Sequence, residues 1–308
     1  MAKLREVHWE VTNRCNLRCK TCLPMSGPPR PGELTTREVL AALEKLRLAD
    51  VTFLGFTGGE PFRRPDFLFI LTHAAALGFQ VSVISNGTLL DDKSLTLVKK
   101  LKVRLGISLD GTNPSVNDRL RGPGTFEKVL QALKACQILS LPVQLYFTFN
   151  RINFCELPKL GSFVKGYGCQ SLHISELTLE GRALQFAKLL NLTLEQKAKT
   201  TAVVTKLAKE GFNEKLSKPD DSCWLDGASL FLTADGRIYP CTEIWQRRPD
   251  FSLGNIRSYD LARWPNFSGK RNVLRGNCCY SVLGSKRITL VINNLQKCAF
   301  FGQTGKES

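Results

Sequence analysis

The sequence is poor in histidine and methionine, has no long hydrophobic run, and carries fewer acidic than basic residues. It holds 3 His and 2 Met in 308 residues. No apolar stretch approaches the roughly 20 residues of a membrane span, and no apolar segment with a cleavage site follows the first residues. Lys and Arg number 43 against 27 Asp and Glu, a net charge of +16. We therefore expect a cytoplasmic protein with no membrane partner. The charge favours an anionic partner without identifying it.

Cysteine is the abundant exception, with 11 residues. A chain of this length does not need disulfides to support its core, and a reducing compartment would keep the thiols free. Thiolates or metal ligands are the expected use. Hydrophobic residues make up 43% and charged residues 23%, which is ordinary for a globular protein and excludes collagen-like or wholly disordered chains.

The first two-thirds of the chain alternates strand-like and helix-like segments. The predicted strands are Arg5–Thr12, Val51–Thr57, Phe79–Ser85, Val103–Leu109, Pro142–Asn150 and Ser171–Leu177. The predicted helices are Thr35–Leu48, Asp66–Leu77, Asp91–Leu101, Thr125–Leu139 and Cys155–Lys165. Strands with helical crossovers form a parallel sheet, here an α/β fold that is either an open doubly wound sheet or a curved partial barrel.

Polar residues gather where the predicted strands end. In a parallel sheet these carboxyl ends meet at one edge and usually form the site. The residues are Thr12-Asn13, Thr57-Gly58-Gly59-Glu60, Ser85-Asn86, Ser108-Leu109-Asp110, Thr148 with Asn150, and Ser175-Glu176.

The texture of the chain changes near residue 218. Residues 194–216 are predicted to be helical, and Lys218-Pro219 then breaks the pattern. Beyond it, Ala228–Thr233 and Arg237–Pro240 flank Ala234-Asp235-Gly236, which predicts a hairpin. We expect a domain of residues 1–217 and a small C-terminal α+β domain of residues 218–308.

Three cysteines follow the first strand as Cys15-x3-Cys19-x2-Cys22. A zinc site usually has four ligands in two separated pairs. Three thiolates with no nearby fourth ligand better suit an iron–sulfur cube with one iron left open. Buried free cysteines or a zinc knuckle are the alternatives.

Cys15-Asn16-Leu17-Arg18-Cys19-Lys20-Thr21-Cys22, followed after the second strand by Gly58-Gly59-Glu60-Pro61, resembles the signature of the radical S-adenosylmethionine (SAM) enzymes. The resemblance implies a partial (β/α)6 TIM-like barrel. It also implies a [4Fe–4S] cluster on Cys15, Cys19 and Cys22, with SAM bound to the open iron.

The resemblance also implies SAM-binding positions at the strand ends. By it, Gly58, Gly59 and Glu60 would hold the amino group of SAM. The other implied positions are Asn86, Ser108, Asp110, Thr148 and, from Glu180-Gly181-Arg182-Ala183, Arg182 pairing with a carboxylate. The alternatives are ordinary strand-end caps and, for Arg182, a solvated surface side chain.

The last stretch resembles the SPASM and twitch domains, which extend radical SAM enzymes and bind auxiliary iron–sulfur clusters. The opening Cys223-x12-Gly236-x4-Cys241 carries this resemblance, and Cys278, Cys279 and Cys298 follow. It implies one auxiliary [4Fe–4S] cluster, with Cys279 or Cys278 completing the ligands, or else buried unliganded cysteines. The spare thiol of the adjacent pair could deliver a hydrogen atom to a substrate radical.

The predicted function is reductive cleavage of SAM to a 5′-deoxyadenosyl radical, which abstracts a hydrogen atom from a peptide or protein undergoing modification. A small-metabolite dehydrogenase or epimerase is one alternative, and a non-catalytic iron–sulfur electron carrier or scaffold is another. A flavodoxin- or ferredoxin-type electron donor is implied. Residues 244–297 hold ten Lys or Arg and two acidic residues. Without an RNA-recognition motif, this basic stretch does not predict a nucleic-acid partner.

Overall fold

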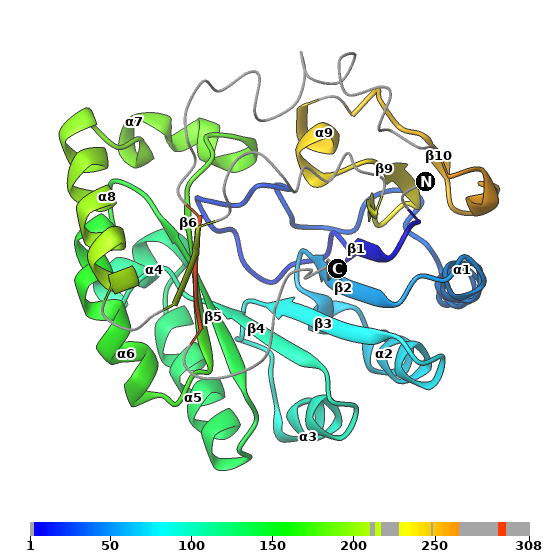
Figure 1. The fold of residues 1–308 in the computed structure, drawn as a ribbon, viewed down its shortest axis with the longest axis horizontal. Coiled ribbons are helices and arrows are strands. Elements are labelled where there is room, and N and C mark those ends of the chain that lie inside the picture. Colours follow the sequence, from blue (N-terminus) through cyan, green and yellow to red (C-terminus); the bar gives the residue numbers. More distant parts are fainter. Residues whose placement is uncertain (1–2, 210–212, 217–227, 248, 265–288, 294–308) are drawn as a thin grey trace, which may run out of the picture.

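The computed structural model describes residues 3–209, 213–216, 228–247, 249–264 and 289–293. Strands β1 to β6 pair in chain order, all parallel, in one curved sheet that does not close (Figure 1). The helices that connect these strands lie along the outer side of the curve (Figure 1). A doubly wound sheet would carry helices on both faces, so the structure is the partial barrel of the two predicted forms.

The described elements have the following bounds. The strands are β1 (Glu6–Thr12), β2 (Phe53–Gly58), β3 (Gln80–Ser85), β4 (Arg104–Ser108), β5 (Val143–Phe149), β6 (Ser171–Glu176), β7 (Asn213–Leu216), β8 (Ser229–Leu232), β9 (Arg237–Tyr239), β10 (Gly254–Asn255) and β11 (Thr289–Asn293). The helices are α1 (Thr36–Leu48), α2 (Phe67–Ala76), α3 (Asp92–Lys100), α4 (Pro114–Arg121), α5 (Thr125–Ile138), α6 (Leu160–Gly166), α7 (Ala187–Leu190), α8 (Leu194–Lys209) and α9 (Thr242–Arg247). Short 3₁₀ turns cover Pro61–Arg63, Phe154–Lys159, Gly181–Phe186 and Leu261–Arg263.

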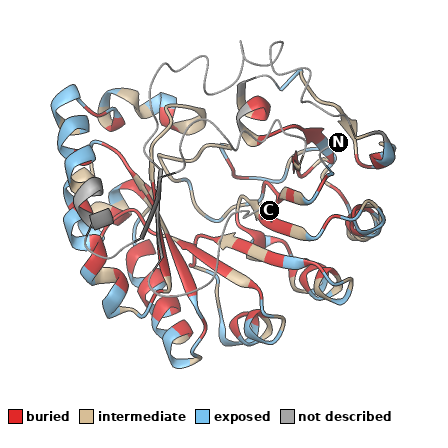
Figure 2. Ribbon diagram, in the orientation of Figure 1, coloured by how far each residue is buried: buried red, intermediate tan, exposed pale blue. Residues whose placement is uncertain are grey.

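The barrel strands alternate between a buried apolar face and a more open polar face. Leu105, Ile107, Leu145 and Phe147 are almost fully buried in the main apolar core. Their neighbours on the opposite face are half-buried and include Ser82, Arg104, Ser108, Tyr146, Thr148 and His173. Figure 2 shows how buried and intermediate residues alternate along the strands of the barrel. Because successive side chains of a strand point to opposite faces, the helices cover the apolar face and the inside of the barrel is polar.

The six predicted barrel strands are confirmed, with ends that differ by one or two residues. Thr35 and Glu38 form a capping box at the start of α1. Helix α4 was not predicted, although Asn113 caps it and Pro114 occupies its first turn, both signals of a helix start.

The prediction of a helix over residues 194–216 is wrong at its end. Helix α8 ends at Lys209, and residues 213–216 form strand β7. β7 pairs with β11, which lies antiparallel to β6. A partner strand some 75 residues later in the sequence is not visible in a local helical pattern, so tertiary pairing overrides propensity here.

The predicted hairpin is confirmed as β8 and β9, which pair antiparallel. β8 also lies parallel to β1, so the hairpin extends the barrel sheet at the edge next to the first strand. The boundary proposed at residues 217 and 218 lies outside the described residues, and the division into two domains stays a prediction.

Candidate active site

Residues 13–35, between β1 and α1, form a loop that carries Cys15, Cys19 and Cys22; we call it the cysteine loop. Its base is closed by two backbone hydrogen bonds, Cys15 N to Gly27 O at 2.8 Å and Gly27 N to Asn13 O at 3.0 Å. The loop therefore leaves the carboxyl end of β1 with Cys15 held at a defined place beside the strand ends.

Nitrogen donors surround two of the three sulfurs. Leu17 N donates to Cys15 Sγ at 3.4 Å, and Ser26 N donates to Cys22 Sγ at 3.3 Å. The amide of Asn86, at the end of β3, lies 3.9 Å from Cys15 Sγ. Donors of this kind stabilise sulfur that carries negative charge, as the thiolate ligands of a cluster do.

The thiols of Cys15 and Cys19 are poor acids without a cation. Burial raises the pKa of Cys15, and the neighbouring Glu60 and Cys22 add to the rise. Burial raises the pKa of Cys19 to about 11; Arg121 opposes the rise, and Cys22 and Cys15 are among the groups that add to it. A nearby positive charge such as iron would favour the thiolate form of Cys15 and Cys19.

Within the described ranges, no three His, Cys, Asp or Glu side chains are gathered so closely that they could hold one metal ion. An iron–sulfur cube binds one thiolate per iron, so its ligands stand farther apart than those of a single ion. Cys15, Cys19 and Cys22 are only half-buried, so a cluster could reach them. In number, chemistry and access, the three thiols fit such a cluster.

The two glycines after β2 allow that strand end to pack directly on the cysteine loop. A Cβ on Gly58, whose φ is 145°, would lie 2.3 Å from Thr12 O. One on Gly59 would lie 2.2 Å from Arg14 O. Gly59 N donates to Thr12 O at 2.7 Å and Glu60 N to Arg14 O at 2.8 Å, so this segment fixes the start of the loop.

The Glu60 carboxylate is fully buried and joins the ends of β2 and β3. It accepts hydrogen bonds from Ser85 Oγ at 2.8 Å, Asn86 N at 2.6 Å and Phe62 N at 3.2 Å. Burial raises the pKa of Glu60 to about 7, against the effect of these donors. Both carboxylate oxygens accept hydrogen bonds from the protein, so Glu60 holds the ends of β2 and β3 together. The predicted contact of Glu60 with SAM stays a prediction.

Asp110 and Thr148 meet as predicted, and Arg121 joins them. Asp110 is fully buried; its Oδ1 accepts from Thr148 N at 3.0 Å and its Oδ2 from Arg121 Nε at 2.8 Å. Arg121 ends α4, and its carbonyl lies 3.8 Å from Cys19 Sγ. Arg121 was not predicted as a site residue, because helix α4 was not predicted. The helix-start signal at Asn113-Pro114 could have revealed α4 and therefore Arg121.

The other predicted positions on β4 and β5 line the inside of the barrel at the same end. Ser108 and Thr148 are half-buried on the polar face, and Thr148 Oγ1 lies 3.5 Å from Ser175 Oγ on β6. Asn150 is fully buried, and its side-chain oxygen accepts from Ile152 N at 2.9 Å. The strand ends therefore converge as the sequence predicted.

Arg182 clamps the cysteine loop. Its Nη1 donates to Cys19 O at 3.0 Å, its Nη2 to Ser26 O at 2.7 Å, and its backbone N to Cys22 O at 3.0 Å. The preceding Gly181 has a φ of 56°, and a Cβ there would lie 2.0 Å from Leu23 O. Arg182 is not a free surface side chain, and among the residues that the structure describes it is paired with no carboxylate. The predicted carboxylate partner stays a prediction.

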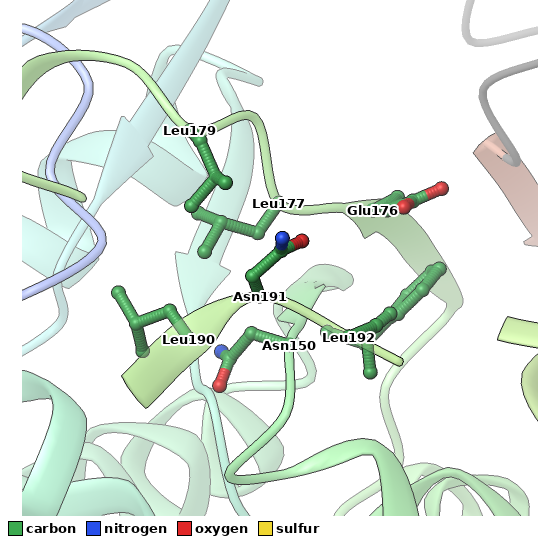
Figure 3. Close-up of a pocket in the computed structure, with 8 residues that line it drawn as sticks. Asn150, Glu176, Leu177, Leu179, Leu190, Asn191 and Leu192 are labelled. Atoms are coloured by element: carbon green, nitrogen blue, oxygen red, sulfur yellow. The ribbon is translucent and has the colours of Figure 1, made fainter. Parts of the chain in front are cut away.

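A small pocket opens at the ends of β5 and β6 (Figure 3). Leucine side chains form much of its wall, and Asn150, Glu176 and Asn191 add polar groups. Its lining residues are Phe149, Asn150, Glu176, Leu177, Leu179, Leu190, Asn191 and Leu192. The pocket is small, with room for little more than a water molecule.

Of the predicted C-terminal ligands, Cys241 is described. It is buried directly after β9 in an apolar cluster with Phe231, Tyr239, Ile244 and Trp245. Cys223, Cys278, Cys279 and Cys298 lie outside the described residues. The auxiliary cluster and the idea of a spare hydrogen-donating thiol therefore stay predictions.

The family model of the Radical SAM superfamily matches residues 9–164, which include the end of β1, the cysteine loop and β2 to β5. The chain belongs to this superfamily, and membership implies a [4Fe–4S] cluster and SAM as its cofactors. No helix among the described residues is long and apolar enough to cross a membrane.

Named relatives have several substrates. The AdoMet-dependent heme synthase of Methanosarcina barkeri is 34% identical over 184 residues, 58% of this chain and 52% of the relative. The mycofactocin maturase MftC of Mycobacterium tuberculosis is 34% identical over 176 residues, 56% of this chain and 45% of the relative. The sporulation killing factor maturation protein SkfB of Bacillus subtilis is 27% identical over 265 residues, 82% of this chain and 62% of the relative. The chain thus spans about half the length of the first two and under two-thirds of SkfB.

Solved structures share the fold at low sequence identity. SuiB of Streptococcus suis bound to its precursor peptide SuiA aligns with a TM-score of 0.71 and 15% identity, over 88% of this chain and 67% of SuiB. The protein anSMEcpe with AdoMet and the Kp18Cys peptide aligns with a TM-score of 0.69 and 17% identity, over 90% and 86%. These alignments confirm the predicted radical SAM partial barrel.

Proposed function

We propose that this protein cleaves SAM reductively and uses the resulting radical to modify a peptide or protein. One observation carries the proposal. The chain belongs to the radical SAM superfamily, and four parts of the protein contact its cysteine loop. These are Gly58–Glu60, Asn86, the end of α4 and Arg182. An electron carrier without a substrate needs thiolates but has no need of polar strand ends that converge beside them.

Some residues of the site would bind the cluster, and others would stabilise its charge. Cys15, Cys19 and Cys22 would ligate the cluster, while Asn86 and the backbone donors of the loop stabilise the sulfur charge. When bound, the reduced cluster and SAM supply a 5′-deoxyadenosyl radical. Arg121, buried beside Asp110 and Cys19, adds fixed positive charge that favours anionic groups at this edge of the barrel.

The ends of β5 and β6 beside the pocket of Figure 3 are the proposed place for the adenosine of SAM. Leu177 and Leu179, both half-buried, offer apolar surface to a flat ring, and the exposed Asn191 offers an amide group to its edge. Thr148, on the polar face of β5, would face the adenosine from inside the barrel.

We propose the substrate class from the names of the relatives. SkfB and MftC are named as maturation proteins, and SuiB is known with a precursor peptide. The match to SkfB covers 82% of this chain, against 58% for the heme synthase, which favours a peptide over a tetrapyrrole. The excess of basic over acidic residues would attract an acidic peptide segment or an acidic flavodoxin- or ferredoxin-type electron donor. A cytoplasmic location would provide the reducing conditions.

Anaerobic reconstitution of the chain with iron and sulfide, followed by dithionite and SAM, tests the proposal. We expect 5′-deoxyadenosine and methionine in equal amounts, measured by chromatography with mass detection, and no product when dithionite is omitted. A fully clustered preparation that forms no 5′-deoxyadenosine would contradict the activity and favour an electron carrier. Adding candidate precursor peptides or an iron porphyrin precursor then separates the two substrate classes.

We further propose an auxiliary cluster that uses Cys241 as a ligand, as the C-terminal cysteine pattern implies. Cys241→Ser should lower the iron content of reconstituted protein by about one cluster, roughly half, while the loop cluster remains. Iron and sulfide analysis with Mössbauer spectroscopy measures this. Cys169→Ser, at another buried thiol, is the matched control and should keep full iron content. Unchanged iron in Cys241→Ser would remove Cys241 from the ligand set.

A further inference from the structure

Arg30, in the cysteine loop, lies between the loop and the C-terminal segment of residues 228–247. Its Nη2 donates to Glu10 Oε1 at 3.1 Å, to Asn13 Oδ1 at 3.3 Å and to Pro24 O at 3.5 Å. On its other side the guanidinium carbon lies 5.0 Å from the ring centroid of Trp245. Arg30 thus contacts residues more than 200 positions away in the sequence.

The C-terminal side of this contact is rigidly built. Trp245, on α9, stacks on Phe231 of β8 with ring centroids 4.8 Å apart and planes 25° apart. Trp245 N donates to Cys241 O at 3.2 Å, so the backbone of Trp245 is joined to the turn that carries this cysteine. The turn between β8 and β9 also meets Glu10, whose Oε2 accepts from Ala234 N at 3.4 Å.

The loop side of the contact leads to the cysteines. Asn13, which Arg30 holds by its side chain, accepts from Gly27 N through its carbonyl, and Gly27 O in turn accepts from Cys15 N. Pro24, the third partner of Arg30, is two residues from Cys22. A shift of Arg30 therefore moves the backbone at both ends of the three-cysteine stretch.

The Arg30 guanidinium is poorly placed for hydrogen bonding at one nitrogen. In the part of the chain that the structure describes, its Nε is buried and has no hydrogen-bond partner. A desolvated guanidinium of this kind gains from the face of an aromatic ring. The indole of Trp245 therefore favours the observed position of Arg30, in addition to the charge of Glu10.

We infer that Arg30 is a positioning residue through which the segment of residues 228–247, by way of Trp245, sets the conformation of the three-cysteine loop. The inference rests on the proposed function only in that it gives this loop the task of holding a cluster. The loop would be incompletely ordered without a segment that the chain supplies some 200 residues later, and the environment of Cys241 would be linked to that of Cys15 and Cys22.

Hydrogen–deuterium exchange of the full chain, before and after cluster reconstitution, tests the inference. In Arg30→Gln and in Trp245→Leu, amides of residues 13–30 should exchange at least about fivefold faster, while β3 to β5 keep their protection. The double variant should exchange no faster than Arg30→Gln alone, because Trp245 acts on the loop through Arg30 and its loss adds nothing once Arg30 is replaced. Trp245→Phe, which keeps an aromatic face, should stay close to the unmodified protein.

Lys45→Met is the matched control. Lys45 Nζ donates to Ile256 O at 2.9 Å and Arg257 O at 2.8 Å, so it also fastens C-terminal residues to the barrel. Its partner Arg257 reaches the cysteine loop at Gly32 O, which lies outside residues 13–30. If Lys45→Met speeds exchange of residues 13–30 as much as Trp245→Leu does, or if Trp245→Leu leaves that exchange unchanged, the inference is wrong.

A second readout separates positioning from general stability. After reconstitution, the electron paramagnetic resonance signal of the reduced cluster and its change on adding SAM should differ in Arg30→Gln, and Arg30→Lys should restore part of it. An identical signal in Arg30→Gln and the unmodified protein would overturn the link to the cluster. Failure of the unmodified protein to cleave SAM would count against the proposed function, whereas the exchange result before reconstitution would still decide the coupling.

Discussion

Substitution of any one of Cys15, Cys19 and Cys22 by alanine should remove the loop cluster and abolish SAM cleavage. Two remaining thiolates leave a second iron without a protein ligand, and the raised pKa of Cys15 and Cys19 shows that these thiols do not ionise readily without a cation. We expect 5′-deoxyadenosine formation to fall by at least about a thousandfold, to the level of the assay background. Iron content, visible absorbance and product formation measure the effect.

Cys155→Ala provides the control for this prediction. Cys155 is exposed in the turn of Phe154–Lys159, and its removal should leave cluster and activity intact. Each loop variant should also keep the circular dichroism of the barrel, because the thiols are half-buried and contribute little to the main core. A Cys22→Ala protein with full iron content and normal SAM cleavage would refute the assignment of the three ligands.

Gly181→Ala should open the contact between the end of β6 and the cysteine loop, with a large loss of stability and of cluster binding. An alanine there has to adopt a φ of 56°, and its Cβ would lie 2.0 Å from Leu23 O and 2.8 Å from Cys22 O. Both obstacles are backbone atoms, which cannot rotate away as side chains do. We expect the free energy of unfolding to fall by about 3 kcal/mol or more, because backbone strain and steric clash add.

Gly78→Ala separates the two causes. Gly78 has a φ of 82° in the turn before β3, but nothing lies within 4 Å of the position of its Cβ. It should lose only about 1–2 kcal/mol, the cost of the left-handed backbone alone. Denaturant unfolding of the chain without cluster compares the two variants, and iron uptake shows whether Arg182 still clamps the loop. Equal destabilisation by both substitutions would mean that the clash at Leu23 is relieved at no cost.

The parallel sheet could be predicted from local pattern because each strand and helix carries its own signal, whereas its closure toward a barrel was implied only by the resemblance to a family. The segment of Val103–Leu109 is apolar and β-branched between polar ends, and Thr35 with Glu38 forms a capping box before a helical apolar pattern. Such signals act over a few residues and survive in the folded chain. Where a partner from elsewhere decided the outcome, as for strand β7, local pattern gave the wrong element.

The roles of charged side chains were harder to predict than their location. Glu60 and Arg182 do lie at the predicted site. However, Glu60 accepts hydrogen bonds from Ser85 and Asn86. Arg182 donates to the carbonyls of Cys19 and Ser26. A motif places a residue beside a ligand, but which hydrogen-bond partner it takes depends on every group within about 3 Å of it.

The sequence by itself determined the parallel α/β sheet and the three cysteines that would bind iron, because the alternation of strands and helices and the spacing of thiols depend on neighbouring residues. The resemblance of its motifs to a known family indicated the family and the barrel. Only the tertiary structure decided what holds the cysteine loop: Arg121 from α4, Arg182 after β6, and Arg30 between Glu10 and Trp245. These contacts join residues about 100 to more than 200 positions apart. Hydrogen bonds and ring contacts act only at close range, so these pairs form only once the chain has folded. They produce no repeating pattern in the sequence from which they could be predicted.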